Sequence, residues 1–297
     1  MSRFRPQALV ALKSYFAAKL ADAKLSRANN VTASPPLVPR EPKHMFMHQG
    51  RCPICETDVT FVAENAWFRD YLLCSKCLSI PRERAVFHIL NSLRPNWRTL
   101  AIHESSPSDR ATSRKLRMEA PGYVATQFDP KVPLGSVHPT LGYRCENLAA
   151  QTFPDASFDI VVTQDVFEHL IEPAGAIRDI ARTLRPGGVH VCSVPIVRKW
   201  EPSRTRASLQ PDGTIKHLLP PEYHGNPVDD TGSLVTVDWG YDIGAFFQEH
   251  SGMHTVIMQI DDINLGIRAE YIEILVSQKA PLGVVVDAPA GSIGMVD

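Results

Sequence analysis

Apolar and polar positions along the chain predict an α/β domain over residues 81–280. Short apolar runs alternate with segments of helical periodicity, which is typical of strands joined by helices. Strands are expected at 98–103, 123–128, 158–163, 189–194, 254–260 and 270–278, and helices at 81–93, 108–119 and 173–184. Because such strands pair in parallel, we expect a doubly wound, mostly parallel sheet. The short link from Asp261 to Arg268 predicts that the last two strands form an antiparallel hairpin.

The two ends of the chain show weaker patterns. Apolar residues at helical spacing predict a helix over 5–26, and the Pro-, Ser- and Asn-containing stretch after it predicts a linker, so 1–45 form one N-terminal segment. This segment is basic, which fits either an organelle transit peptide or a surface helix with a loose linker. We favour the surface helix. Residues 281–297 are rich in small residues and are expected to be a flexible tail.

Four of the six cysteines form two close pairs, Cys52-Pro-Ile-Cys55 and Cys74-Ser-Lys-Cys77. Two residues between thiolates let one tight turn present both sulfurs to one ion, and two such turns complete a tetrahedron. We therefore predict a zinc-ribbon-like module at 46–80 that holds a structural Zn²⁺, with a rubredoxin-like iron site as the alternative. Paired thiols of this kind favour a reducing compartment, so we expect a cytoplasmic protein.

The most specific pattern lies between residues 152 and 195. FPDASFDIVVTQDVFEHL at 153–170 is followed by a predicted helix and then by LRPGG at 184–188. The unbroken apolar run in the first motif is typical of a strand buried on both faces. Doubly wound folds bind ligands at the carboxyl ends of such strands, which here carry Gln164 and Asp165.

These motifs resemble the central motifs of class I S-adenosylmethionine-dependent methyltransferases. YRCENLAAQTFPDASFD at 143–159 and HLLPPEYHGNP at 217–227 are similar to a bacterial subgroup with N-terminal cysteine pairs, and the resemblance covers about 50–278. It implies a Rossmann-like domain with a seven-stranded sheet. It also implies S-adenosylmethionine as the cofactor and methyl transfer as the activity.

The resemblance indicates residues for the cofactor as well. Family members usually carry a glycine-rich first turn, whereas this chain has the small residue Ser105 there, preceded by Glu104, which could face the cofactor's ammonium group. Asp129, at the end of the second strand, is expected at the ribose hydroxyls, or else forms a turn. Asn147 aligns with the residue near the adenine amino group. The remaining expected contacts are Glu146, Gln164 and Asp165.

A polar, proline-rich insertion at 196–242 is expected to form a substrate lid. An oxygen acceptor needs a base to take its proton, and the candidates are His169 at the sheet edge and Glu222 and His224 in the lid. His169 equally fits a role in fixing its own loop. A second zinc site formed by His217, Glu222 and His224 is a further alternative, although their spacing matches no recognised motif.

Composition limits the classes of binding partner that we expect. The net charge of −1 does not favour nucleic-acid binding by the chain as a whole. The sequence has no run of about 18 apolar residues, so we expect no membrane span. We therefore expect a small-molecule or glycan-type acceptor, while the oligomeric state stays open. One alternative is a methyltransferase-like protein that binds without catalysis, because the first turn lacks glycine. The other is an RNA-directed methyltransferase that grips RNA with its knuckle, its N-terminus and Arg82, Arg84, Arg94 and Arg98.

Overall fold

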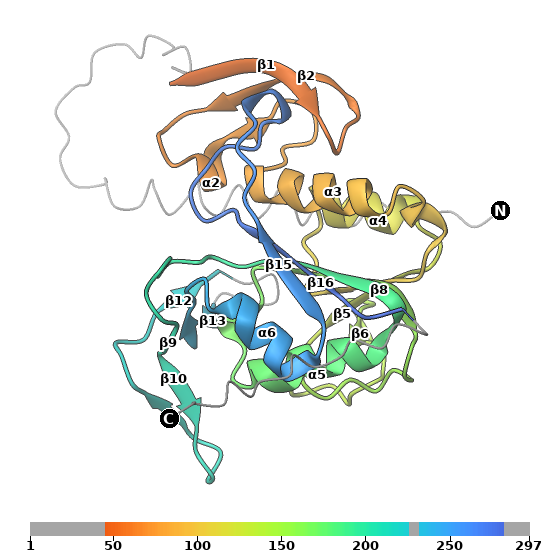
Figure 1. Cartoon of the computed structure of the whole chain (residues 1–297), viewed down its shortest axis with the longest axis vertical. Helices are drawn as coiled ribbons and strands as arrows, with labels where there is room; N and C mark the ends of the chain where they lie inside the picture. The colour runs from red at the N-terminus through yellow and green to blue at the C-terminus, as the bar shows by residue number, and fades with distance from the viewer. Residues whose placement is uncertain (1–44, 226–231, 282–297) are drawn as a thin grey trace, which may run out of the picture. The chain divides into compact units, whose positions relative to one another are not determined.

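The computed structural model describes residues 45–225 and 232–281. The expected N-terminal helix, its linker and the tail from residue 282 onward lie outside these ranges. Within them the chain forms a three-stranded module, a seven-stranded sheet with helices on both faces, and an insertion of short strands (Figure 1). None of the described helices has the length and apolarity that a membrane span requires.

The seven-stranded sheet has the order β15-β16-β8-β7-β4-β5-β6. Its strands are β4 (Ile102–Ser105), β5 (Tyr123–Gln127), β6 (Arg144–Cys145), β7 (Phe158–Gln164), β8 (Leu184–Ser193), β15 (His254–Met258) and β16 (Ile274–Gln278). The five strands from β4 to β8 pair in parallel, whereas β16 is antiparallel to both β8 and β15. The predicted doubly wound, mostly parallel seven-stranded sheet with an antiparallel C-terminal hairpin is confirmed.

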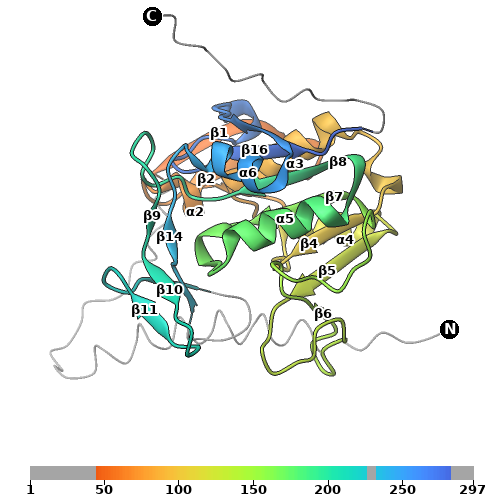
Figure 2. The same cartoon turned by 60° about the horizontal axis from the view of Figure 1, so that its bottom comes forward.

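Helices cover both faces of this sheet. α3 (Pro81–Leu93) and α4 (Ala111–Glu119) lie on one face, and α5 (Pro173–Thr183) and α6 (Ile243–Ser251) lie on the other (Figures 1 and 2). Successive side chains of a strand point to opposite faces, so Ile160 and Val162 of β7 enter one core while Val161 enters the other. This double burial explains the unbroken apolar run in the central motif.

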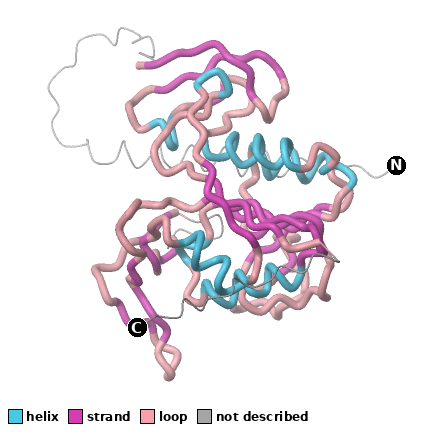
Figure 3. The backbone as a smooth tube through the Cα atoms, in the orientation of Figure 1, coloured by secondary structure: helices cyan, strands magenta, loops and turns pink. Residues whose placement is uncertain are grey.

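The cysteine pairs lie in a separate antiparallel sheet. It consists of β1 (Phe46–Cys52), β2 (Thr57–Ala63) and β3 (Leu73–Cys74), with the short helix α2 (Phe68–Tyr71) before β3 (Figure 3). The fully buried guanidinium of Arg84, on α3, donates to the carbonyls of Ser79, Leu72 and Gly266. Arg84 therefore joins the module to α3 and to the β15–β16 connection.

That connection differs from the expected short hairpin link. It contains the 3-10 helix η3 (Ile263–Leu265) and packs on the β1–β2 hairpin. A Cβ atom added to Gly50 would collide with the carbonyl of Asn264, and one added to Gly266 would collide with the ring of Phe61. The close approach needs glycine on both sides, and it makes the connection a clamp on the cysteine module.

Other element bounds also differ from expectation. The strand predicted at 98–103 begins only at Ile102, because Trp97–Thr99 form the 3-10 helix η1 with Trp97 buried. α4 begins at Ala111 rather than at 108, and α6 was not predicted. Helix α6 packs by Phe247 against the α5 face of the sheet, a tertiary contact that its short sequence does not reveal.

The described residues of the insertion form three small antiparallel strand pairs. They are β9 (Arg204–Thr205) with β14 (Val237–Asp238), β10 (Ala207–Leu209) with β11 (Ile215–His217), and β12 (Tyr223–His224) with β13 (Ser233–Leu234). The backbone N–H of Thr236 donates to the carbonyl of Glu168 over 2.7 Å, which ties the insertion to the 3-10 helix η2 (Phe167–His169) that follows β7. The insertion is thereby fixed at the carboxyl edge of the sheet (Figure 2).

Candidate functional site

A cavity of about 1220 Å³ lies at the carboxyl edge of the parallel strands. The ends of β4, β5 and β7 contribute Ser106, Gln127 and Gln164, the cysteine module contributes Trp67, and the insertion supplies much of the remaining wall. Small-molecule sites occupy roughly 300–1,000 Å³. The cavity therefore has room for a nucleotide-sized cofactor together with a second ligand.

Glu104 lies beneath this cavity rather than in its wall. The carboxylate is fully buried and accepts hydrogen bonds from Ser113 Oγ (2.6 Å), Tyr123 OH (2.8 Å) and Gln164 Nε2 (2.8 Å). Burial raises the pKa of Glu104, while these three donors act against the rise. Its hydrogen bond to Gln164 fixes that amide. Gln164 Oε1 is then a buried acceptor without a partner among the described residues, in a side chain that lines the cavity.

Asp165 also lines the cavity, where it binds two arginines. Its carboxylate lies 2.9 Å from Arg69 Nη2 of the cysteine module and 2.8 Å from Arg82 Nε of α3, and it accepts from Ser193 Oγ. Burial would raise the pKa of Asp165, but the charges of Arg82 and Arg69 lower it to about 2. Asp165 has a φ of +52°, which is strained backbone for a residue other than glycine. It links the module to the edge of the sheet.

The other expected cofactor residues make local hydrogen bonds. Asp129 Oδ1 accepts from the backbone of Lys131, and Asn147 Oδ1 accepts from the backbone of Ala149. Glu146 binds Arg144 and Thr152. These three residues lie outside the cavity wall, and so does Ser105, whereas its neighbour Ser106 (φ +55°) lines it. The structure thus brings only Gln164 and Asp165 of the expected set into the wall.

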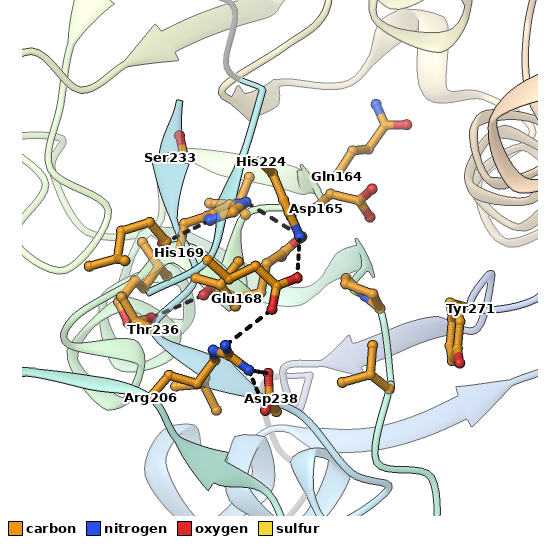
Figure 4. A pocket seen from close by; sticks show the side chains of 18 of the residues that line it. Gln164, Asp165, Glu168, His169, Arg206, His224, Ser233, Thr236, Asp238 and Tyr271 are labelled. Carbon is orange, nitrogen blue, oxygen red and sulfur yellow. Dashed lines mark hydrogen bonds and ion pairs between the residues drawn. The ribbon is translucent and has the colours of Figure 1, made fainter. Parts of the chain in front are cut away.

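The three expected catalytic residues also line the cavity, and Figure 4 shows His169 and His224 close together there. His169 Nδ1 lies 3.0 Å from the carbonyl oxygen of Leu234, and because a carbonyl oxygen only accepts, Nδ1 carries the proton and donates it. The rings of His169 and His224 lie 5.2 Å apart. Glu222 Oε1 is 3.5 Å from His224 Nε2, and Arg206 holds the same carboxylate at 3.1 Å. His217, in the exposed strand β11, is not part of this wall.

Glu168 belongs to this group although the sequence did not single it out. Its carboxylate is 2% exposed, with Oε1 3.7 Å from His169 Nε2. Burial, and next the charge of Asp165, raise the pKa of Glu168 well above its usual value. Burial lowers the pKa of His169. The motif VFEHL contained Glu168, but only the fold shows that its side chain reaches the cavity.

Arg69 and Arg82 also line the cavity, although the sequence did not assign them to the cofactor site. Arg82 was considered only within an RNA-binding cluster, and the structure pairs that whole cluster internally. Arg84 is buried, Arg94 donates to the carbonyl of Gly187, and Arg98 binds Glu119. Within the described residues, these arginines therefore do not form an unpaired basic surface that RNA could bind.

The four paired cysteines converge on one point. Cys52 Sγ lies 3.8 Å from Cys77 Sγ, and Cys55 Sγ lies 3.8 Å from Cys74 Sγ, with all four sulfurs within 4.8 Å of one another. A regular tetrahedron with Zn–S bonds of about 2.3 Å has S···S edges of about 3.8 Å. The donor set and its spacing fit a closed, four-thiolate metal site.

A doubly wound sheet whose parallel strands end at a polar cavity defines a protein of the nucleotide- or cofactor-binding α/β class. Comparison with known proteins narrows this class. A family model described as a methyltransferase domain matches residues 121–192, which run from β5 to β8. The strand order and the antiparallel β16 give the chain a methyltransferase-like fold.

Curated relatives point to the same class. A probable S-adenosylmethionine-dependent methyltransferase of Mycolicibacterium smegmatis is 42% identical over 67 residues, 23% of this chain and 26% of that protein. One of Mycobacterium tuberculosis is 39% identical over 143 residues, 48% of this chain and 47% of that protein. The chain thus matches about half or less of the length of these relatives. A solved S-adenosylmethionine-dependent methyltransferase from Mesorhizobium loti is 15% identical, with a TM-score of 0.43, over 66% of this chain and 98% of that one.

Proposed function

We propose that the protein is an S-adenosylmethionine-dependent methyltransferase that acts on a small-molecule or glycan-type acceptor. The observation that carries this proposal is the cavity at the carboxyl ends of β4, β5 and β7, of which β5 and β7 lie in the region that matches a methyltransferase domain. The polar side chain of Gln164, which lines this cavity, has an amide oxygen without a partner among the described residues, and such an acceptor is suited to a cationic or N–H-bearing ligand. The volume leaves space for the acceptor beside the cofactor.

The cofactor would lie over the ends of β4 and β7, against Ser106 and Gln164. Glu104 acts on it through Gln164, and Asp165 through the two arginines that it orients. Asp129, Glu146 and Asn147 border the β5 and β6 side, where the ribose and adenine are expected to bind after local rearrangement of their present hydrogen bonds. When bound, the cofactor supplies an electrophilic methyl group.

The acceptor would bind between the strand ends and the insertion. The chain's own contribution is to align the acceptor and to exclude water, which alone can account for much of a methyl-transfer rate. For an oxygen acceptor, the group formed by His169, Glu222 and His224 takes the proton. His169 is suited to this because burial lowers its pKa and its Nε2 is unprotonated. Arg204, Arg206 and Asp238 in the same wall favour a polar acceptor.

We further propose that the four cysteines bind a structural zinc ion. The tetrahedral sulfur spacing and the set of four cysteine ligands support this role, because structural zinc sites take all four ligands from the protein. The module supplies Trp67 and Arg69 to the cavity wall. By stabilising the module, the ion would hold these two side chains in position without itself reaching the cavity. Reduced, metal-bound thiols fit a cytoplasmic location.

Calorimetry with S-adenosylmethionine and S-adenosylhomocysteine tests the proposed function. We expect saturable binding of both by the full chain, and at least tenfold weaker binding by Gln164→Ala, because that change removes a polar side chain from the cavity wall at the end of β7. Gln248→Ala is the matched control, since Gln248 is exposed on α6 and lies outside the cavity. Folded wild-type protein that binds neither compound would contradict the proposal and favour a non-catalytic methyltransferase-like protein.

A further inference from the structure

Three side chains with metal-binding atoms meet at the acceptor side of the cavity. The ligand atoms of Glu168, His169 and His224 all lie within 4.8 Å of one another. Glu168 and His169 come from η2 after β7, and His224 comes from β12 of the insertion. Two elements distant in the sequence therefore supply one compact donor set, and all three residues line the cavity (Figure 4).

His169 is held as a metal-binding histidine would be. Its Nδ1–H donates to the carbonyl of Leu234 over 3.0 Å, which fixes the ring and leaves the Nε2 lone pair facing the cluster. Metal-bound histidines typically donate their other ring N–H to a carbonyl or carboxylate in this way. The carbonyl belongs to β13, next to β12, so the strand pair that presents His224 also orients His169.

Glu168 provides the second, independent observation. Its side chain is 2% exposed, and Oε2 has no hydrogen-bond partner within residues 45–225 and 232–281. The nearest titratable groups do not neutralise this carboxylate, because His169 presents an unprotonated Nε2 to it and Asp165 is itself an acid that binds two arginines. A buried carboxylate without hydrogen bonds is costly, and a bound cation would offset that cost.

We propose that Glu168, His169 and His224 bind a divalent first-row transition cation that keeps open coordination positions toward the cavity. Two imidazoles and one carboxylate are the donor set of catalytic zinc and of related iron and manganese sites, and they disfavour Mg²⁺, which prefers oxygen. Metal bonds of about 2.0–2.2 Å require the three ligands to move closer together. His224 has room to do so, because its side chain is 41% exposed.

The role of this cation in catalysis rests on the proposed methyltransferase function. A cation at this position would bind an oxygen of the acceptor and lower the pKa of a bound hydroxyl. With both imidazoles acting as ligands, Glu222 is the group left to take the proton, 3.5 Å from His224 Nε2. The site would thus select acceptors that carry an oxygen donor next to the methylated position.

Cobalt titration of the zinc-loaded full chain, followed by visible absorption, tests the site directly. We expect about one Co²⁺ per chain beyond the cysteine-bound zinc, with d–d bands but without thiolate-to-cobalt charge transfer. His224→Ala should weaken this binding at least tenfold, and Glu168→Gln should weaken it similarly. His217→Ala is the matched control, because His217 is exposed on β11 and lies outside the cluster.

The inference would be overturned if the zinc-loaded wild type bound no Co²⁺. It would also be overturned if His224→Ala bound Co²⁺ as tightly as the wild type. His224→Ala is informative even if Glu168→Gln fails to fold, because His224 is partly exposed whereas Glu168 is buried. S-adenosylhomocysteine binding is measured on the same samples. A protein that binds S-adenosylhomocysteine but no second cation refutes the cation site alone, and one that binds cation but no S-adenosylhomocysteine refutes the methyltransferase proposal instead.

Discussion

At the scale of single residues, the site depends on buried polar groups that hold one another in place. Glu104 shows this most clearly, because three donors converge on its carboxylate and one of them is the cavity residue Gln164. The sequence predicted that Glu104 would face the cofactor, but the structure places it beneath the cavity wall, behind Gln164. A spacing motif identifies the turn but does not distinguish a residue in the wall from one that supports it.

Glu104→Ala is expected to lower the free energy of unfolding by about 2–4 kcal/mol, because it leaves buried donors of Ser113 and Tyr123 without an acceptor. Urea denaturation measures this loss. Glu119→Ala, which removes a more exposed carboxylate paired with Arg98 and Lys115, should cost less than about 1 kcal/mol. Equal losses in the two variants would show that the Glu104 network does not stabilise the fold.

A buried histidine predicts a specific dependence of stability on pH. Burial, and next the charge of His103, lower the pKa of His190 to about 3. The unfolded chain binds a proton at this residue below pH 6.5 and the folded chain does not, so stability falls as the pH decreases from 6.5 toward 3. His190 accounts for a slope of about 1.4 kcal/mol per pH unit in that window.

The measurement is urea denaturation of wild type and His190→Gln between pH 7 and pH 4.5. The variant should lose stability less steeply than wild type, by about 1.4 kcal/mol per pH unit. His254→Gln serves as the control, since His254 is exposed, and it should keep the wild-type slope. Parallel curves for wild type and His190→Gln would contradict a neutral, buried His190.

At the scale of elements, periodic apolar patterns predicted the sheet well. They did not predict the contacts between residues far apart in the sequence. β7 contains the apolar run from Ile160 to Val162, and β8 ends in the mostly apolar stretch from Val189 to Cys192, so both strands and the ligand-binding edge followed from the sequence. By contrast, the pairing of Arg69 with Asp165 joins residues 96 positions apart, and the clamp of η3 on β1 depends on the approach of Gly50 to Asn264. Neither contact leaves a local signal.

The cysteine module is the element whose loss should be most informative. Cys74→Ser is expected to reduce bound zinc from about one ion per chain to near zero and to lower the melting temperature by several degrees, because the metal contributes folding free energy. Elemental analysis and a thermal melt measure both effects. Cys145→Ser is the control, since Cys145 is buried outside the cluster, and it should keep its zinc. Full zinc content in Cys74→Ser would contradict a four-thiolate site.

At the scale of the whole molecule, one cavity is built by three parts of the described chain. The sheet supplies Gln164 and Asp165, the cysteine module supplies Arg69, and the insertion supplies Glu222 and His224. The sequence indicated each part separately, including the lid, but it could not show that the module borders the same space. The cysteine module and the insertion thus border the same cavity, so substitutions in either part are expected to change which ligands the cavity accepts.

A crystal structure of the full chain with S-adenosylhomocysteine tests the central claim most directly. We expect the nucleoside over the carboxyl ends of β4 and β5, the amino-acid end against Gln164, and the sulfur facing His169 and His224. A ligand bound elsewhere, or a cavity filled by side chains of the chain itself, would contradict the account.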